Sequence, residues 1–258
     1  MNEYSLPNNS CDLSGQVALV TGTTSGLGWR FARVLASAGA RVALTGRRTE
    51  RLEELGEQIR KDGGESAAFT LDMTRMDDVV EVVGKVEEAL GTVSILVNNA
   101  GIPDAQRAHK MSQDLIDAVF DTNLRGPYVL SCEVARRLIA AKIPGRMVNI
   151  SSVGAFNYAG GGAALYSITK AGIVRMTEVL AVEWARYNIN VNGIAPGSFA
   201  SEMMDGMVER IGEFYKATPR KRLCDPAQLD STLLYLCAPS SECVTGTVIT
   251  VDDGQAPR

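Results

Sequence analysis

The segment Val17-Ala18-Leu19-Val20-Thr21-Gly22-Thr23-Thr24-Ser25-Gly26-Leu27-Gly28 sets the architecture of this chain. It starts as a short apolar run typical of a buried strand and continues into a glycine-rich turn where a helical pattern begins. Glycines allow the backbone to approach a phosphate closely, and a helix N-terminus offers free N–H groups and a positive dipole. Alone, such a turn is a weak indication of nucleotide binding, but after the first strand of a parallel sheet it is a stronger one. The predicted dinucleotide contacts in this turn are Gly22, Thr24, Ser25, Gly26, Leu27 and Gly28.

Short apolar runs alternate with amphipathic stretches along the rest of the chain. The runs are continuously apolar, which predicts parallel strands covered on both faces. They are Val17–Val20, Val42–Leu44, Ala67–Leu71, Ile95–Val97, Met147–Ile150, Ile189–Ile194 and Val248–Val251. Helical patterns lie between them over 26–38, 49–62, 76–90, 112–141, 164–187 and 226–237. The alternation predicts an α/β fold, a doubly wound parallel sheet with right-handed crossovers and helices on both faces.

Neither a linker nor an internal repeat divides the sequence, so we expect residues 1–258 to form one domain that both binds the dinucleotide and carries the catalytic groups. Residues 198–225 depart from the strand–helix rhythm. Their methionines and aromatic residues among charges are typical of a short helical insertion over a substrate pocket, and equally of an extra helix packed on the surface.

The ends of the second and third predicted strands bear on the choice of dinucleotide. An acidic residue that binds the ribose of NAD is expected about 20 residues after the glycine turn. Arg47 and Arg48 stand there instead, and two guanidinium groups suit the 2′-phosphate of NADP. The less favoured alternative is that they are solvated charges at a helix start, pairing with Glu50 or Glu53. Asp72, followed by Met73, ends the third strand, where it can meet the adenine or cap the next helix.

Three further groups of polar residues stand at or after strand ends. Asn99, Ala100 and Gly101 follow the fourth strand, which lies beside the first at the switch point of a doubly wound sheet. Ser151 and Ser152 follow the fifth strand, and we interpret Ser151 as a turn residue. Tyr166 and Lys170 are four apart and therefore share a helical face, where an ammonium lowers the pKa of a phenol.

Composition excludes several classes of protein. A net charge of −4, with both signs mixed along 258 residues, gives no footprint for nucleic acid or an anionic membrane. Neither a membrane span nor a signal peptide is expected, since no apolar stretch reaches about 18 residues and residues 1–15 lack a basic leader. Five cysteines form no CxxC pair and His109 is the only histidine, so we expect free cysteines, no metal site and a cytoplasmic protein.

These motifs occur together and in order, as TGxxxGxG, the Asn98–Gly101 turn, Ser152 and YxxxK. With them the chain resembles the short-chain dehydrogenase/reductase family, in its single-domain branch, from about Leu13 to Gly254. The resemblance implies a Rossmann-like seven-stranded sheet and a nicotinamide cofactor. It also implies a homotetramer built through the helices over 112–141 and 164–187 and through the final strand.

The resemblance further implies residue roles. The catalytic tetrad comprises Asn123, Ser152, Tyr166 and Lys170, of which Tyr166 and Lys170 also contact the cofactor. The nicotinamide side comprises Pro196, Gly197, Phe199 and Ser201, the last standing where threonine is usual. Two departures occur. Ser152 and Tyr166 are 14 positions apart, one more than is common, with Gly160–Gly162 taking up the insertion, and Asp253 stands where a second glycine is usual.

We therefore expect an NADP(H)-dependent oxidoreductase, with NAD(H) as the alternative cofactor, that interconverts a ketone and a secondary alcohol by hydride transfer. Tyr166 would act as acid and base. Apolar side chains in the predicted walls, 153–162 and 198–215, with 102–110 at the mouth, favour an apolar or bifunctional ketone. They include Phe156, Tyr158, Phe199, Met203, Met204 and Met207.

Several alternatives stay open. Within the family, 3-oxoacyl-thioester reductases and sugar-acid dehydrogenases look similar. From other classes, a non-catalytic NADPH-binding sensor need not keep the four reactive side chains, and an extended-branch epimerase or dehydratase usually carries a longer C-terminal domain.

Overall fold

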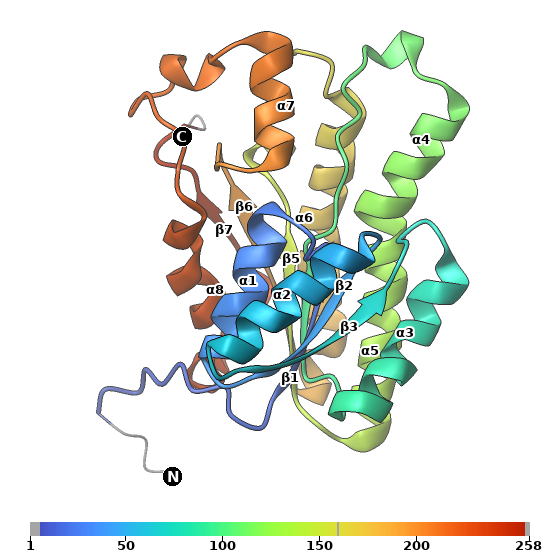
Figure 1. The fold of residues 1–258 in the computed structure, drawn as a ribbon, viewed down its shortest axis with the longest axis vertical. Coiled ribbons are helices and arrows are strands. Elements are labelled where there is room, and N and C mark those ends of the chain that lie inside the picture. The colour runs from blue at the N-terminus through green and yellow to red at the C-terminus, as the bar shows by residue number, and fades with distance from the viewer. Residues whose placement is uncertain (1–5, 159, 256–258) are drawn as a thin grey trace.

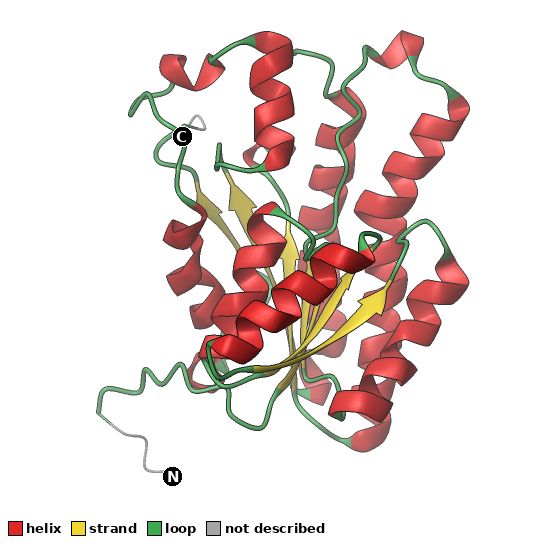
Figure 2. Cartoon of the chain, in the orientation of Figure 1, coloured by secondary structure: helices red, strands yellow, loops and turns green. Residues whose placement is uncertain are grey.

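The computed structural model describes residues 6–158 and 160–255. Residues 1–5, part of the segment in which no signal peptide is expected, and residue 159 of a predicted pocket wall lie outside the described residues. One parallel sheet runs in the order β3-β2-β1-β4-β5-β6-β7, with helices on both faces (Figures 1 and 2). Its strands are β1 (Val17–Thr21), β2 (Arg41–Gly46), β3 (Glu65–Thr70), β4 (Ile95–Asn98), β5 (Gly145–Ile150), β6 (Ile189–Pro196) and β7 (Val248–Val251). The Rossmann-like seven-stranded sheet is thereby confirmed.

Eight α-helices are present in the described residues. They are α1 (Gly26–Ser37), α2 (Thr49–Lys61), α3 (Met76–Leu90), α4 (Gln113–Phe120), α5 (Gly126–Ala141), α6 (Ala164–Trp184), α7 (Glu202–Ile211) and α8 (Asp230–Cys237). None of the helices within 6–158 and 160–255 combines the length and the apolar character that crossing a bilayer requires.

The core consists of two clusters, one on each face of the sheet. Ala18 and Val20 of β1 pack into the cluster formed with α1, α2 and α8, whereas Val17 and Leu19 pack into the cluster formed with α3, α5 and α6. Successive side chains of a strand point to opposite faces, so a strand buried on both faces favours apolar residues at successive positions. The uninterrupted apolar run in β1 has this cause.

The prediction that every strand is fully covered on both faces is wrong for β3. Glu65, Ala68 and Thr70 are exposed there, and β7 at the opposite edge is only half-buried throughout. Both are edge strands, with a neighbour on one side only, so less of their surface lies under helices.

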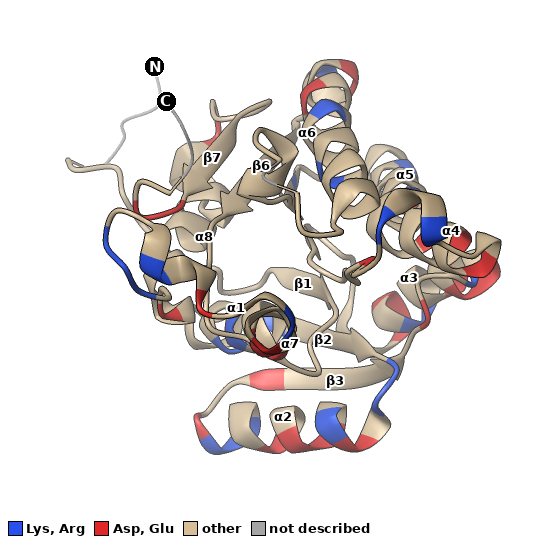
Figure 3. Ribbon diagram, turned by 90° about the horizontal axis from the view of Figure 1, so that it is seen from above, with Lys and Arg blue, Asp and Glu red and all other residues tan. Residues whose placement is uncertain are grey.

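The helical stretch expected over 112–141 is found from Gln113 to Ala141, with helical backbone throughout. A π-helical segment, Asp121–Arg125, lies between α4 and α5 and carries the buried Asn123. The insertion over 198–225 contains α7 and a short 3-10 helix, Phe214–Ala217. Seen from above, α7 lies over α1 (Figure 3), and a Cβ at Gly26 would be 3.2 Å from the Ser201 Cβ just before α7. The insertion therefore covers the glycine turn.

Candidate active site

The glycine turn after β1 forms a cradle that side chains would fill. Gly22 and Gly26 have φ of +71° and +56°, and a Cβ at Gly28 would lie 2.2 Å from the Gly22 carbonyl oxygen. Ser25, at the start of α1, makes no side-chain cap, and the first turn of α1 contains no acidic residue. The N–H groups of that turn thus remain open to an anion, so the turn fits the diphosphate of a dinucleotide.

The turn after β4 is fastened to this cradle. The Thr21 hydroxyl accepts the backbone N–H groups of Asn99 and Ala100, each at 3.0 Å. The Asn99 amide donates to the Thr21 carbonyl at 2.9 Å and to the Gly22 carbonyl at 3.2 Å. The Asn99 amide thus shapes the cradle from β4, across the switch point.

The two arginines after β2 differ in their contacts. The Arg48 guanidinium donates to the Thr24 hydroxyl at 3.1 Å and to the Glu202 carboxylate at 3.0 Å. Arg47 is exposed and lies near enough to Asp72 to act on its charge. Although partial burial raises the pKa of Asp72, hydrogen bonds from the Thr74 N–H and hydroxyl and the charge of Arg47 hold it below its usual value. Asp72 thus forms a turn before α3, and Met73 beside it is buried.

Ser152, Tyr166 and Lys170 meet beyond the end of β5. The Lys170 ammonium lies 5.6 Å from the centre of the Tyr166 ring and donates to the Ile150 carbonyl at 2.8 Å. Ser152 accepts the Gly154 N–H at 3.0 Å and interacts with the Tyr166 hydroxyl. Ser151 instead donates to the Lys170 carbonyl at 2.8 Å, which agrees with its structural interpretation.

Burial dominates the titration of this group. It raises the pKa of the Tyr166 phenol, as does the nearby charge of Asp104, while the hydrogen bond with Ser152 lowers it. Burial also lowers the pKa of Lys170 to about 8. A phenol and an amine held together in a desolvated place can exchange protons with a bound substrate near neutral pH.

Asn123 is fully buried behind this group. Its side chain bonds both backbone groups of Ile102, at 2.8 and 2.9 Å, and donates to the Thr169 hydroxyl at 3.3 Å. A Cβ at Gly101 would lie 3.5 Å from both the Asn123 oxygen and the Lys170 nitrogen. Because residue 101 is glycine, the space between these two side chains stays open.

Asp104 is a site residue that the sequence reasoning missed. Its carboxylate is 2% exposed and accepts the backbone N–H groups of Leu165 at 2.8 Å and Tyr166 at 3.2 Å. It therefore fastens the loop after β4 to the first turn of α6. A lone acid a few residues beyond an Asn-Asn-Ala-Gly turn carries no periodic signal, and only its distance from a helix start could have suggested it.

The predicted walls of the substrate pocket need one correction. The Phe199 side chain is 3% exposed and packs in the core, so it is not a lining residue of a substrate pocket. Phe156, Tyr158 and Met203 are exposed.

The residues expected on the nicotinamide side lie after β6. Ser201 caps α7 by accepting the Met204 N–H at 3.2 Å, and Gly197, which follows Pro196, donates its N–H to the Val251 carbonyl at 2.9 Å.

Both departures from the family pattern have structural explanations. Gly160, Gly161 and Gly162 all have positive φ, between +76° and +93°, so this turn takes up the extra residue at low steric cost. Asp253 has φ of +56°, a region that aspartate tolerates better than most residues. Its carboxylate pairs with Arg222 at 2.8 Å and Arg220 at 3.0 Å, which ties the end of the insertion to the chain after β7.

Two expectations concern cysteines and metals. All five cysteines are free. Among the residues that the structure describes, no three His, Cys, Asp or Glu side chains gather as metal ligands.

The chain is similar to known proteins over most of its length. The model of the short chain dehydrogenase family matches residues 16–211. The chain is 34% identical to gluconate 5-dehydrogenase of Gluconobacter oxydans (94% of this chain, 95% of the relative) and 35% identical to 3-oxoacyl-[acyl-carrier-protein] reductase of Aquifex aeolicus (94% and 98%). A structure from Agrobacterium tumefaciens with bound NADP, described provisionally as a 2-deoxy-D-gluconate 3-dehydrogenase, superimposes with a TM-score of 0.86 at 32% identity (96% and 98%).

Proposed function

The chain belongs to the short-chain dehydrogenase family, and from that premise we propose that it prefers NADP(H) and uses Tyr166 as its proton donor and acceptor. Its reaction class is that of the family, an oxidoreductase that acts on CH–OH and C=O groups with a nicotinamide cofactor. The observation that carries the assignment of Tyr166 is its meeting with Ser152 and Lys170 beside the open cradle of α1.

Residues along one edge of the sheet would hold the cofactor. The turn Gly22–Gly28 suits the diphosphate, and Arg47 with Arg48 suits a 2′-phosphate. Asp72 with Met73 would take the adenine, the turn at Asn99–Gly101 would pass beneath, and Lys170 would bind the nicotinamide ribose. The segment with Pro196, Gly197, Phe199 and Ser201 would hold the nicotinamide, through its backbone at Phe199. When bound, the nicotinamide supplies or accepts the hydride.

The protein's own groups would handle the proton and the developing charge. Burial keeps Tyr166 protonated, so it can donate a proton to the alkoxide that forms from a ketone. Ser152 would donate a hydrogen bond to the same oxygen. The ammonium of Lys170 favours the tyrosinate that remains, because opposite charges attract strongly in a desolvated place. Asn123 would hold a water that links Lys170 to solvent, so that the proton is replenished, and the absence of a side chain at Gly101 beside both groups supports this role.

The substrate proposal is a mainly apolar or bifunctional ketone. The exposed aromatic groups of Phe156 and Tyr158 and the exposed Met203 support it. Arg107, His109 and Lys110 are exposed as well, at the mouth, and could serve a carboxylate. Relatives at this similarity include both a 3-oxoacyl-thioester reductase and a sugar-acid dehydrogenase, so the proposal extends to both kinds of ketone.

A panel of 3-oxoacyl thioesters and keto sugar acids, assayed with NADPH and NADH in parallel, tests the function. Tyr166→Phe should abolish turnover while NADPH still binds, as measured by the fluorescence of the bound cofactor. Near-normal turnover by this variant would overturn the assignment, and so would wild-type protein that binds NADPH yet reduces no ketone, as a sensor would.

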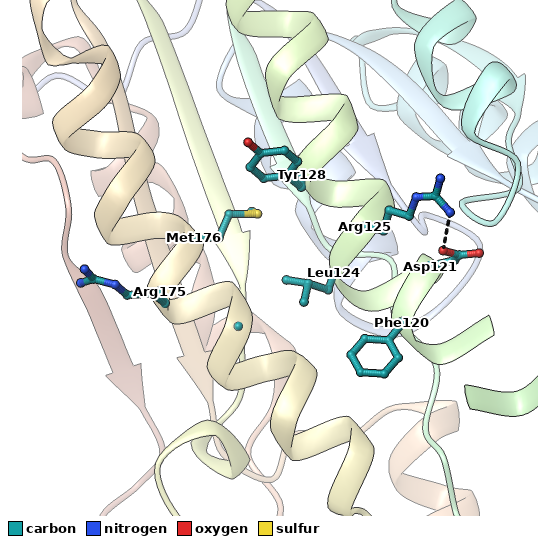
Figure 4. A pocket seen from close by; sticks show the side chains of 8 residues that line it. Phe120, Asp121, Leu124, Arg125, Tyr128, Arg175 and Met176 are labelled. Carbon is teal, nitrogen blue, oxygen red and sulfur yellow. Dashed lines mark hydrogen bonds and ion pairs between the residues drawn. The ribbon is translucent and has the colours of Figure 1, made fainter. Parts of the chain in front are cut away.

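We also propose a homotetramer. A groove of about 570 Å³ lies between α6 and the helical stretch that runs from α4 into α5, and it is lined by Leu124, Tyr128 and Met176 among others (Figure 4). Exposed apolar side chains continue along α6, where Val182 is 81% exposed. Light scattering should give four times the chain mass of 27.6 kDa. The free cysteines, two of them exposed, support a reducing compartment, and we propose the cytoplasm.

A further inference from the structure

Arg48, which the proposed function assigns to a 2′-phosphate, is already paired. Its guanidinium has two anchors, Thr24 on the glycine turn and the Glu202 carboxylate at the first residue of α7, 154 positions away. The Arg48 and Glu202 side chains are about half exposed, at 49% and 58%. Any anion that binds Arg48 therefore comes beside the charge of Glu202.

The surroundings keep Glu202 ionised. The hydrogen bond from Arg48 is the main cause that holds the pKa of Glu202 below its usual value. The Ser25 hydroxyl and the charges of Arg48 and Arg51 act in the same direction, against partial desolvation. Through Ser25 the carboxylate also reaches the start of α1, so Glu202 connects the insertion to the cradle and to the arginine beside it.

We infer that Glu202 is a cofactor-specificity residue that weakens binding of a 2′-phosphate and thereby lets the protein use NAD(H) as well as NADP(H). The inference rests on the proposed function, because it takes Arg48 as the 2′-phosphate partner. A phosphate and a carboxylate that share one guanidinium repel each other, whereas a ribose 2′-hydroxyl can donate to a carboxylate. Proteins of this fold that bind NAD carry an acidic residue after the second strand, and this chain has none there. Glu202 instead brings an acidic group to Arg48 from α7.

The contrast with other acids of α7 supports this reading. Asp205 and Glu209 lie on the same helix, and no ion pair with an arginine of the cradle is found for either in the described residues. Glu202 alone among them meets Arg48. Negative charge on α7 in general does not explain the contact.

Two small ligands separate the 2′-phosphate from the rest of the dinucleotide. Adenosine 2′,5′-bisphosphate and 5′-AMP are titrated into the apoprotein by calorimetry, with NADPH and NADH titrated in parallel. Glu202→Gln should tighten the bisphosphate about three- to tenfold and 5′-AMP less than twofold, because the lost charge acts on the 2′-phosphate. NADPH should gain over NADH by the same ratio. Glu209→Gln, which removes the same charge from the same helix, should leave all four affinities unchanged.

Arg48→Gln separates failure of this inference from failure of the proposed function. If Arg48→Gln weakens the bisphosphate selectively and Glu202→Gln changes nothing, the specificity role is overturned and the NADP preference stands. If Arg47→Gln and Arg48→Gln both leave the bisphosphate unaffected, the NADP preference itself is overturned. Equal tightening of the bisphosphate and 5′-AMP by Glu202→Gln would also overturn the inference, because the carboxylate would then act on the phosphate at Ser25. In the Arg48→Gln background, Glu202→Gln should lose its effect.

Discussion

The buried carboxylate of Asp104 accepts the backbone N–H of Tyr166 at 3.2 Å, across 62 positions of sequence. The loop after β4 and the helix that carries the proposed proton donor are thus joined by one acidic side chain. Its charge is also one of the causes that raise the pKa of the Tyr166 phenol. Asp104 therefore acts as a positioning residue.

Asp104→Asn should shift the pH dependence of alcohol oxidation to lower pH. The asparagine oxygen can still accept the N–H groups of Leu165 and Tyr166, but the lost charge lowers the pKa of Tyr166, so its basic form appears at lower pH. The rate of oxidation measured against pH, with saturating cofactor, gives this shift directly. Asp114→Asn, at an exposed position of α4, is the control. An unchanged profile in Asp104→Asn contradicts the electrostatic role, and Asp104→Ala should destabilise the fold by about 1–3 kcal/mol through its unpaired N–H groups.

Lys170→Met should be more stable than wild type at pH 7 and almost inactive. Burial lowers the pKa of Lys170 from 10.5 to about 8, so its charge opposes folding. That opposition is complete below pH 8, declines as the pH rises to 10.5, and vanishes above it. With the lost hydrogen bond to the Ile150 carbonyl subtracted, the gain at pH 7 is about 1–3 kcal/mol.

Denaturant unfolding of Lys170→Met and wild type from pH 7 to pH 10.5, without dinucleotide, measures this gain, which should shrink across the range. Lys61→Met, at an exposed position of α2, should show no such trend. Turnover of Lys170→Met should fall at least about a hundredfold. A variant less stable than wild type at pH 7 means that the ammonium is better paired than its burial indicates.

Gly28→Ala should abolish dinucleotide binding and destabilise the fold. The added Cβ would lie 2.2 Å from the Gly22 oxygen and 2.4 Å from the Asn99 amide nitrogen, so the cradle must shift. Gly206→Ala on α7 meets nothing within 4 Å and should stabilise that helix by about 0.5–1 kcal/mol. Thermal unfolding and NADPH titration of both variants make the comparison. NADPH affinity retained by Gly28→Ala would exclude this turn as the diphosphate site.

Val182→Glu should break the proposed homotetramer. The valine is 81% exposed on α6, and a charge there is unfavourable only if another chain covers it. Light scattering should report a smaller mass. Val80→Glu, on the exposed face of α3, is the matched control. The same mass for Val182→Glu and wild type would place the interface elsewhere or exclude it.

The sequence predicted most of the fold and the order of the site groups for a simple reason. Strands buried on both faces favour continuous apolar runs, such as Val17–Val20 in β1, and a residue pressed against another backbone segment must be glycine, as Gly28 is against the Gly22 carbonyl. It failed for β3, because an apolar run does not reveal whether a strand lies at an edge, and for Phe199, because a large apolar residue suits a pocket wall and a core equally.

Features that depend on neighbouring residues could thus be predicted from the sequence alone. They include the strands, the glycine turn, the helix starts and the position of Tyr166 and Lys170 on one helical face. Contacts between distant segments could not. Asp104 meets Tyr166, and Glu202 meets Arg48, only after the sheet has aligned the ends of its strands and the insertion has folded back over α1. The physical reason is that a single acidic residue carries no periodicity, so its partner depends on the path of the whole chain.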